Sequence, residues 1–181
     1  MRLISGVALW PVLMALCACT PTFNWRTVQL DTPGAEVLLP CKPDRGVRSV
    51  TLAGQPLEMS MVGCDAGGAT FAVAWAALPG TVLPGDALAH WRSATLAHIH
   101  AAPAPTAALD AAFIPPGALP LPQAVRVLAT GQRATGAPVT AQAAWFAHRV
   151  GGTTYVLHAV VYADQADVSV ADTFFAGIRF P

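Results

Sequence analysis

Cysteines are the residues of this chain whose type and position most directly predict chemistry. The chain has four: Cys17 and Cys19 end an apolar N-terminal run, and Cys41 and Cys64 lie in the sequence that follows. A thiol at the end of an export signal can be acylated, and two thiols in an exported domain can form a disulfide. Their chemistry therefore depends on whether the chain leaves the cytoplasm.

The N-terminal segment has the layout of a secretion signal. Arg2 supplies one positive charge, and residues 3–18 form an almost uninterrupted apolar run. The run is shorter than the ~20 residues that a spanning helix needs, and it contains Pro11. We expect a cleaved signal peptide over residues 1–18, with a permanent transmembrane helix as the alternative.

The end of this segment predicts a lipid anchor. Leu16-Cys17-Ala18-Cys19 is similar to the bacterial lipobox, in which a branched residue and two small residues precede the acylated cysteine. Cys19 is therefore the predicted lipidation site, carrying palmitate or similar acyl chains, and ordinary signal cleavage beside an unmodified Cys19 is the alternative. Three acyl chains would hold the protein on a membrane, because one chain alone gives marginal binding. Thr20, where an aspartate could stand, favours the outer membrane facing the periplasm.

Cys41 and Cys64 would then be the two cysteines of the folded domain. In an oxidising compartment such a pair predicts a structural disulfide. Closing a loop of about 24 residues would stabilise the fold by about 3 kcal/mol. Metal binding by the pair would need further ligands, and redox catalysis usually uses a C-x-x-C spacing, so both alternatives rank below the disulfide.

Two histidines near the end of a predicted helix could bind a metal. His98 and His100 would need a third ligand such as Asp86, His90 or Asp110, and residues two apart do not share a helix face. The favoured interpretation is a solvated helix end, where histidines lie near the negative end of the helix dipole. No metal site and no cofactor are predicted.

Other catalytic patterns are missing from the sequence. His158 could act as a general base, but a packed, hydrogen-bonded histidine fits its place within a predicted strand better. No serine lies in a G-x-S-x-G elbow, and no G-x-x-x-x-G-K loop is present. Ten basic and ten acidic residues give no basic surface of the kind that nucleic acid requires. We predict a non-enzymatic protein that does not bind nucleic acid.

Most of the elements that position these residues are predicted strands. Strand-like patterns cover residues 27–30, 36–39, 57–62, 69–78, 124–130, 138–150 and 153–163. Pro40, Pro43 and Gly46 predict a break around Cys41, and residues 63–68 predict a link between two strands.

A hairpin turn at Gly151-Gly152 is the clearest local signal. Counting outward from that turn pairs Phe146 with Leu157, Trp145 with His158, and His148 with Tyr155. Both faces of this hairpin are mostly apolar, so we expect its sheet to be covered on both sides.

The predicted strand at residues 69–78 should allow a helix to pack closely on one of its faces. Phe71, Val73 and Trp75 alternate with Ala72 and Ala74, so one face is bulky and the other nearly bare. Four tryptophans could line a ligand cleft, but core packing is the favoured interpretation for them, namely Trp25, Trp75, Trp91 and Trp145.

Two helices are predicted. The first opens at Pro84-Gly85-Asp86, with Asp86 as its N-cap, and ends before Pro103. The second covers residues 166–176 and ends at Gly177. Between them, residues 101–122 predict a proline- and alanine-rich connector, in which residues 110–113 could add a helical turn.

The end of the chain resembles the close of PsbP-like domains. The residues that carry this resemblance are Thr173-Phe174-Phe175, Gly177-Ile178-Arg179-Phe180 and the early Val37-Leu38-Leu39-Pro40-Cys41-Lys42-Pro43. The resemblance covers about two-thirds of the mature chain and implies an antiparallel sheet between helices. The family includes accessory proteins of the lumen and periplasm, most of them not known as enzymes, so the resemblance implies such a protein. The whole chain is also similar in style to uncharacterised proteobacterial lipoproteins.

Together these patterns predict a single α+β domain over residues 27–181, with a mostly antiparallel sheet flanked by helices. A signal peptide at 1–18 and a lipidated tether at 19–26 would precede it. The leading functional hypothesis is a membrane-anchored accessory or assembly factor of the cell envelope that binds a protein partner. The alternative is a module that binds a small ligand or lipid in a pocket between sheet and helix.

Overall fold

The structure is a computed structural model that describes residues 21–101, 110–165 and 167–181. The predicted signal peptide, Cys19 and residues 102–109 of the predicted connector lie outside the described residues. The described part contains the strands β1 Arg26–Leu30, β2 Ala35–Leu39, β3 Asp44–Leu52, β4 Gln55–Ala66, β5 Ala69–Leu78, β6 Ala111–Ala112, β7 Val125–Gln132, β8 Pro138–Val150 and β9 Thr153–Ala163, and the helices α1 Pro84–His98 and α2 Val168–Ala176.

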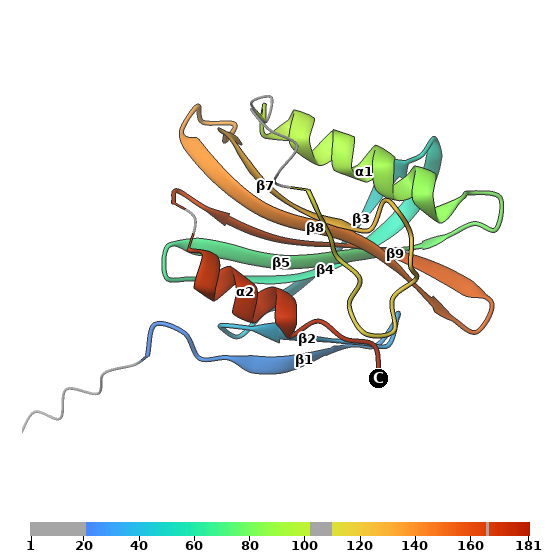
Figure 1. Cartoon of the computed structure of the whole chain (residues 1–181), viewed down its shortest axis with the longest axis horizontal. Coiled ribbons are helices and arrows are strands. Elements are labelled where there is room, and N and C mark those ends of the chain that lie inside the picture. The colour runs from blue at the N-terminus through green and yellow to red at the C-terminus, as the bar shows by residue number, and fades with distance from the viewer. Residues whose placement is uncertain (1–20, 102–109, 166) are drawn as a thin grey trace, which may run out of the picture.

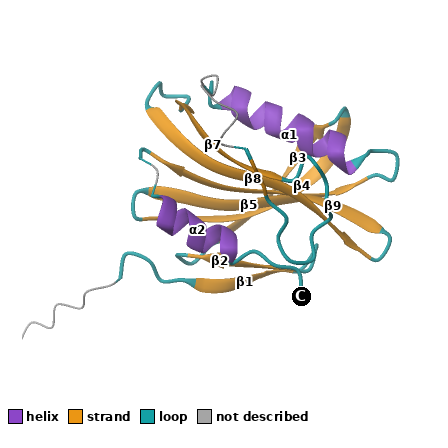
Figure 2. Cartoon of the chain, viewed as in Figure 1, coloured by secondary structure: helices purple, strands orange, loops and turns teal. Residues whose placement is uncertain are grey.

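The strands form two antiparallel sheets. β1 and β2 pair with each other, and the other seven strands form one sheet in the order β3-β4-β5-β9-β8-β7-β6 (Figure 1). Helix α1 covers one face of the large sheet, and α2 lies with β1 and β2 against the other face (Figure 2). The predicted α+β class, with a mostly antiparallel sheet, is therefore confirmed for the described residues.

The core has one layer on each face of the large sheet. Phe71, Val73 and Trp75 of β5 pack with β1, β2 and α2, whereas Ala74 and Ala76 of the same strand pack with α1. This division follows from the two-residue period of a strand, which points alternate side chains to opposite faces. The bare face predicted for residues 69–78 is the face that α1 covers.

The predicted register of the β8–β9 hairpin is confirmed. Phe146 pairs with Leu157, Trp145 with His158, and His148 with Tyr155. The tight turn fixes this register, because a two-residue connection leaves one way to align the strands. β7, which overlaps the strand pattern predicted at residues 124–130, pairs with β8 on the other side of the hairpin.

Strands β3 and β4 differ from the sequence prediction. The break expected around Cys41 ends at Pro43, and Gly46 lies inside β3. β4 continues through Ala66, so the predicted link at residues 63–68 shrinks to the turn Gly67-Gly68, where both residues have positive φ. Pairing with β3 ends at Gly63, but pairing with β5 continues to Ala66, and these hydrogen bonds outweigh the weak strand preference of Gly63 and Asp65.

Helix α1 also differs at both ends. Its N-cap is Leu83, without a side-chain cap, and Asp86 lies in the first turn, so the predicted N-cap at Asp86 is wrong. Pro84 begins the helix, where its missing N–H costs no hydrogen bond. The helix ends at His98, short of the predicted end before Pro103, because the backbone turns into the left-handed region at His100 (φ 47°).

The last part of the chain follows the prediction more closely. Asp167 caps α2 by accepting hydrogen bonds from the backbone N–H groups of Ser169 and Val170, both at 3.1 Å. The helix ends at Ala176, with Gly177 as its C-cap, as predicted. Residues 110–113 do not form the predicted helical turn, since β6 lies there and pairs with β7.

The segment before β1, expected as a tether, has two aromatic residues that pack against the domain. The rings of Phe23 and Trp25 lie 5.9 Å apart, and each meets Phe71 edge to face, at 6.5 and 6.1 Å. A side chain at Gly67 would collide with Phe23, because an added Cβ would lie 2.5 Å from that ring. Ordered packing therefore begins before residue 27.

Candidate functional site

A cavity of about 600 Å³ lies between α1 and the face of the large sheet that this helix covers. Its size is in the range of pockets that hold small molecules, roughly 300–1,000 Å³. Strands β4, β5, β8 and β9 contribute its floor, and the C-terminal half of α1 contributes its roof. The apolar lining residues are Met59, Met61, Ala72, Ala74, Trp91, Ala94, Ile99, Ala134, Val139 and Val160, and the polar ones are Arg48, Thr95, His98, Gln132, Arg133, Thr135, His158 and Tyr162.

The small side chains of β5 and α1 explain why space remains here. Ala72 and Ala74 present only methyl groups to the helix, and Ala94 is the corresponding small residue on the helix. Nearer the start of α1, the buried side chains of Leu88 and Trp91 fill the space between helix and sheet. The cavity therefore opens under the second half of the helix.

At one end of the cavity, a glycine allows the end of α1 to lie directly against β7. The backbone N–H of Gln132 donates a 2.6 Å hydrogen bond to the carbonyl oxygen of Ile99, just after α1. A Cβ at Gly131 would lie 2.1 Å from that same oxygen. The end of α1 can approach β7 this closely because residue 131 has no side chain.

His158 lines the cavity with an uncharged imidazole ring. Its ring stacks on Trp145, with centroids 4.9 Å apart, and meets the ring of Trp91 at 5.4 Å. Nδ1 lies 3.1 Å from the carbonyl oxygen of Ala144, and since a carbonyl only accepts, Nδ1 carries the hydrogen. Burial lowers the pKa of His158 to about 4, against the opposing effect of the bond to Ala144. The side chain is therefore uncharged at neutral pH.

The charged side chains of the lining are basic. Arg48 and Arg133 both line the cavity, and no aspartate or glutamate does. Arg133 has a carboxylate partner, Asp164, at 3.3 Å. Burial raises the pKa of the Tyr162 phenol above its ordinary value, so this side chain also stays neutral and can donate a hydrogen bond.

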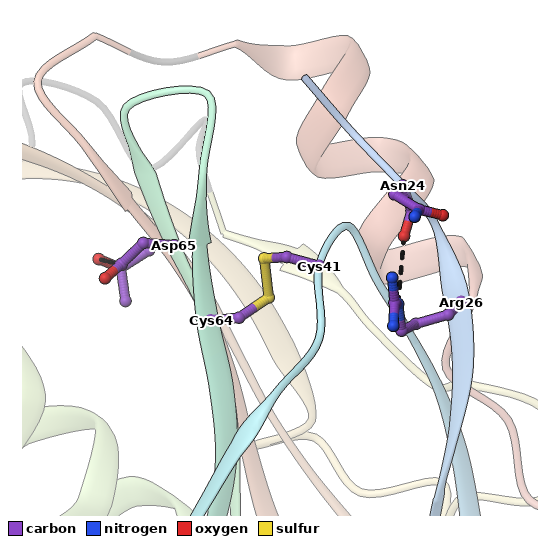
Figure 3. Close-up of a disulfide and its surroundings, with 6 residues drawn as sticks. Asn24, Arg26, Cys41, Cys64 and Asp65 are labelled. Carbon is purple, nitrogen blue, oxygen red and sulfur yellow. Dashed lines mark hydrogen bonds between the residues drawn. A yellow bond between two sulfur atoms is a disulfide. The ribbon is translucent and has the colours of Figure 1, made fainter. Parts of the chain in front are cut away.

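The predicted cysteine pair lies away from this cavity. Cys41, in the loop after β2, is joined to Cys64 on β4 by a disulfide with an S–S distance of 2.01 Å (Figure 3). This is the pairing expected from the sequence, and it links the small sheet to the large one. Cys64 packs with the core layer that contains Phe71, on the face opposite the cavity. Its position indicates a structural role.

The two histidines considered for metal binding do not lie together with other ligands. His98 is at the mouth of the cavity and His100 is exposed beyond the helix end. Asp110 pairs with Arg92, and His90 accepts a hydrogen bond from the backbone N–H of Ala53. Within residues 21–101, 110–165 and 167–181, no three His, Cys, Asp or Glu side chains gather in a group that could hold a metal.

The tryptophans divide between the core and the cavity. Trp145 is fully buried, Trp75 packs on the opposite face, and Trp91 contributes to the cavity wall. Sequence reasoning did not single out Arg48 or Arg133. A prediction of β3 would have been the signal for Arg48, because alternation along that strand places it beside Met59.

Neither helix in the described part of the chain is long and apolar enough to cross a membrane. Comparison with protein-family models, with curated proteins and with solved structures finds no match to this chain. The PsbP-like resemblance therefore stays a prediction.

Proposed function

We propose that this chain is a non-enzymatic envelope lipoprotein that binds a small apolar or amphipathic ligand in the cavity between α1 and the sheet. The observation that carries the proposal is the cavity: its volume, its apolar floor and its few polar groups together resemble a small-molecule site. This is the second of the two functions expected from the sequence. The first, an accessory or assembly role with a protein partner, stays a prediction that is compatible with ligand binding.

The chemistry of the lining favours binding over turnover. None of the lining residues is a serine, cysteine, aspartate or glutamate. The lining hydroxyls belong to Thr95, Thr135 and Tyr162, and among the described residues none of them is hydrogen-bonded to His158, so no nucleophile is paired with a base. Nδ1 of His158 is held by a backbone carbonyl, which orients the ring but cannot stabilise a charge on it as a carboxylate would. The large apolar area of the lining would instead stabilise a complex with an apolar ligand, because binding removes the hydrocarbon of the ligand from water.

The proposed anchor gives the cavity access to such a ligand. If Cys19 is acylated, the domain is held beside a bilayer, from which single-chain amphiphiles can exchange. We propose the outer membrane, with the domain facing the periplasm, as its location. Phe23, four residues after Cys19, already packs against Phe71 of the domain, so the domain would lie next to the lipid surface.

Photolabelling of the anchored protein tests ligand binding. The full chain is placed in phosphatidylcholine nanodiscs with hexadecanol that carries a diazirine near its tail, and labelled peptides are identified by mass spectrometry. Label should appear on peptides of the cavity floor, in β4 and β9. Ala94→Trp places an indole at the mouth of the cavity and should raise the half-labelling concentration about tenfold, or about 1.4 kcal/mol, because the indole occupies space that the probe would fill.

Ala97→Trp is the matched control. Ala97 is an exposed alanine on the same helix that does not line the cavity, so its replacement should leave labelling unchanged. Absence of label from the cavity floor of the native protein would refute the proposed function. An equal loss in both tryptophan variants would refute the assignment of labelling to the cavity.

A further inference from the structure

The acidic residues of the chain leave one cavity arginine without a partner. All ten aspartates and glutamates lie in the described segments, and none of them lines the cavity. The ion pairs among the described residues use Arg92, Arg126, Arg133 and Arg179. Arg48 is in none of these pairs, so its charge at the cavity is uncompensated by any described carboxylate.

The position of Arg48 follows from the pairing of β3. Its Cα partner is Met59, so the two side chains share the cavity face of the sheet. Arg45, three residues earlier, points to the opposite face and donates a 3.0 Å hydrogen bond to the carbonyl oxygen of Gln29. The strand thus carries two arginines with different surroundings, one tied to β1 and one at the cavity edge.

The lining changes from charged to apolar across the sheet. Beyond Arg48 come Met59 and Met61 of β4, then Ala72 and Ala74 of β5, and then Val160 of β9. A guanidinium at the edge of a hydrocarbon surface matches a molecule with an acidic head and an apolar tail. Arginine recognises carboxylates and phosphates through paired N–H donors, and the methionine side chains adapt to a flexible chain.

We infer that the cavity binds a single-chain anionic amphiphile, with its carboxylate or phosphate headgroup at Arg48 and its hydrocarbon chain along the floor formed by β4, β5 and β9. The inference rests on the proposed ligand-binding function and names its substrate class. Arg133 contributes less to headgroup binding, because Asp164 already offsets its charge.

Three probes with the same tail separate the headgroup from the chain. Hexadecanoate, hexadecyl phosphate and hexadecanol, each with a diazirine at the same carbon, are compared on the full chain in uncharged phosphatidylcholine nanodiscs. At least one acidic probe should half-label the cavity floor at a concentration about tenfold below that of the alcohol, because a guanidinium forms charge-assisted hydrogen bonds with a carboxylate or phosphate and only neutral-acceptor bonds with a hydroxyl group. The acid with the lower half-labelling concentration identifies the headgroup as carboxylate or phosphate.

Substitutions on β3 test the role of Arg48. Arg48→Gln should abolish the tenfold preference for the acidic probes without changing labelling by hexadecanol, and Arg48→Lys should restore part of it. Arg45→Gln removes the same charge from the same strand but on the other face, so it should leave the preference intact. Urea unfolding of each variant establishes that it is folded before its labelling is compared.

The outcomes distinguish this inference from the function on which it rests. If hexadecanol and an acidic probe label the cavity equally, and Arg48→Gln changes neither, the anionic headgroup is refuted while ligand binding stands. If no probe labels the cavity floor, the proposed function fails first. An equal loss of preference in Arg45→Gln and Arg48→Gln would refute a specific role for Arg48.

Discussion

His158 is a buried titratable side chain whose neutral form the fold requires. Its pKa falls from the ordinary 6.5 to about 4 because burial penalises the imidazolium, and the bond to Ala144 offsets this only in part. The unfolded chain therefore binds a proton first as the pH falls. The neutral His158 side chain therefore contributes fully to the free energy of unfolding above pH 6.5, and this contribution is lost progressively between pH 6.5 and 4.

This behaviour predicts an acid-sensitive stability above the carboxylate range. From pH 7 to pH 5 the native protein should lose about 2 kcal/mol of unfolding free energy through His158. His158→Gln should lower the stability at pH 7 but remove most of this pH dependence. Urea unfolding at both pH values measures the difference, and His98→Gln, at an exposed position, is the control.

The two carboxylates with lowered pKa values, Glu36 and Asp167, do not explain a loss of stability between pH 7 and 5. Hydrogen bonds from Gln29 and Arg179 lower the pKa of Glu36, and those from Val170 and Ser169 lower that of Asp167. Both groups therefore stabilise the fold above their ordinary pKa values near 4 and lose that effect below them. An undiminished loss between pH 7 and 5 in His158→Gln would contradict the assignment to His158.

At the scale of the element, the junction of α1 with β7 depends on a missing side chain. Gly131→Ala should destabilise the protein by about 2 kcal/mol, because the added methyl group meets the backbone oxygen of Ile99, which cannot move independently of the helix end. Gly152→Ala is the control, since no atom lies within 4 Å of its added Cβ. Urea unfolding of the two variants should differ clearly, and equal stabilities would show that the junction tolerates a side chain.

The disulfide joins two elements that otherwise meet through side chains. Cys41 and Cys64 are 23 residues apart, and a closed loop of this length stabilises a fold by about 3 kcal/mol in the chain-entropy model. The double variant Cys41→Ala/Cys64→Ala should lose about that amount in urea unfolding. Adding reductant should destabilise the native protein but not the double variant, and an effect on both would contradict the assignment.

Elements were predictable where one local signal decides the structure. The glycine pair at 151–152 fixes the β8–β9 register, and the alternation at 69–78 separates the two faces of β5. β3 was not predicted, because its residues alternate weakly and Gly46 usually interrupts strands. β3 is stabilised by its pairing with β4. A local sequence pattern does not show which strand a segment pairs with.

At the scale of the whole molecule, the cavity was predictable in kind but not in detail. Alanines that face a helix indicate that the helix can approach the sheet closely. Where they leave a cavity depends on the exact path of α1 across the large sheet. The basic edge of the cavity combines Arg48 from β3 with Arg133 from the turn after β7. These residues are distant in sequence, and only the strand order of the sheet brings them to the same cavity.

Membrane attachment is the property on which the access of ligand to this cavity depends. Cys19 lies outside the described residues, and the sequence predicts that it, and not Cys17, carries the lipid. Cells grown with alkyne-tagged palmitate should yield labelled native protein and labelled Cys17→Ser, whereas Cys19→Ser should carry no label. Mass spectrometry of the native N-terminus should show acylated Cys19 as the first residue. Retention of label in Cys19→Ser, or an unlabelled full-length chain in the cytosol, would remove the anchor and with it the membrane as the source of the ligand.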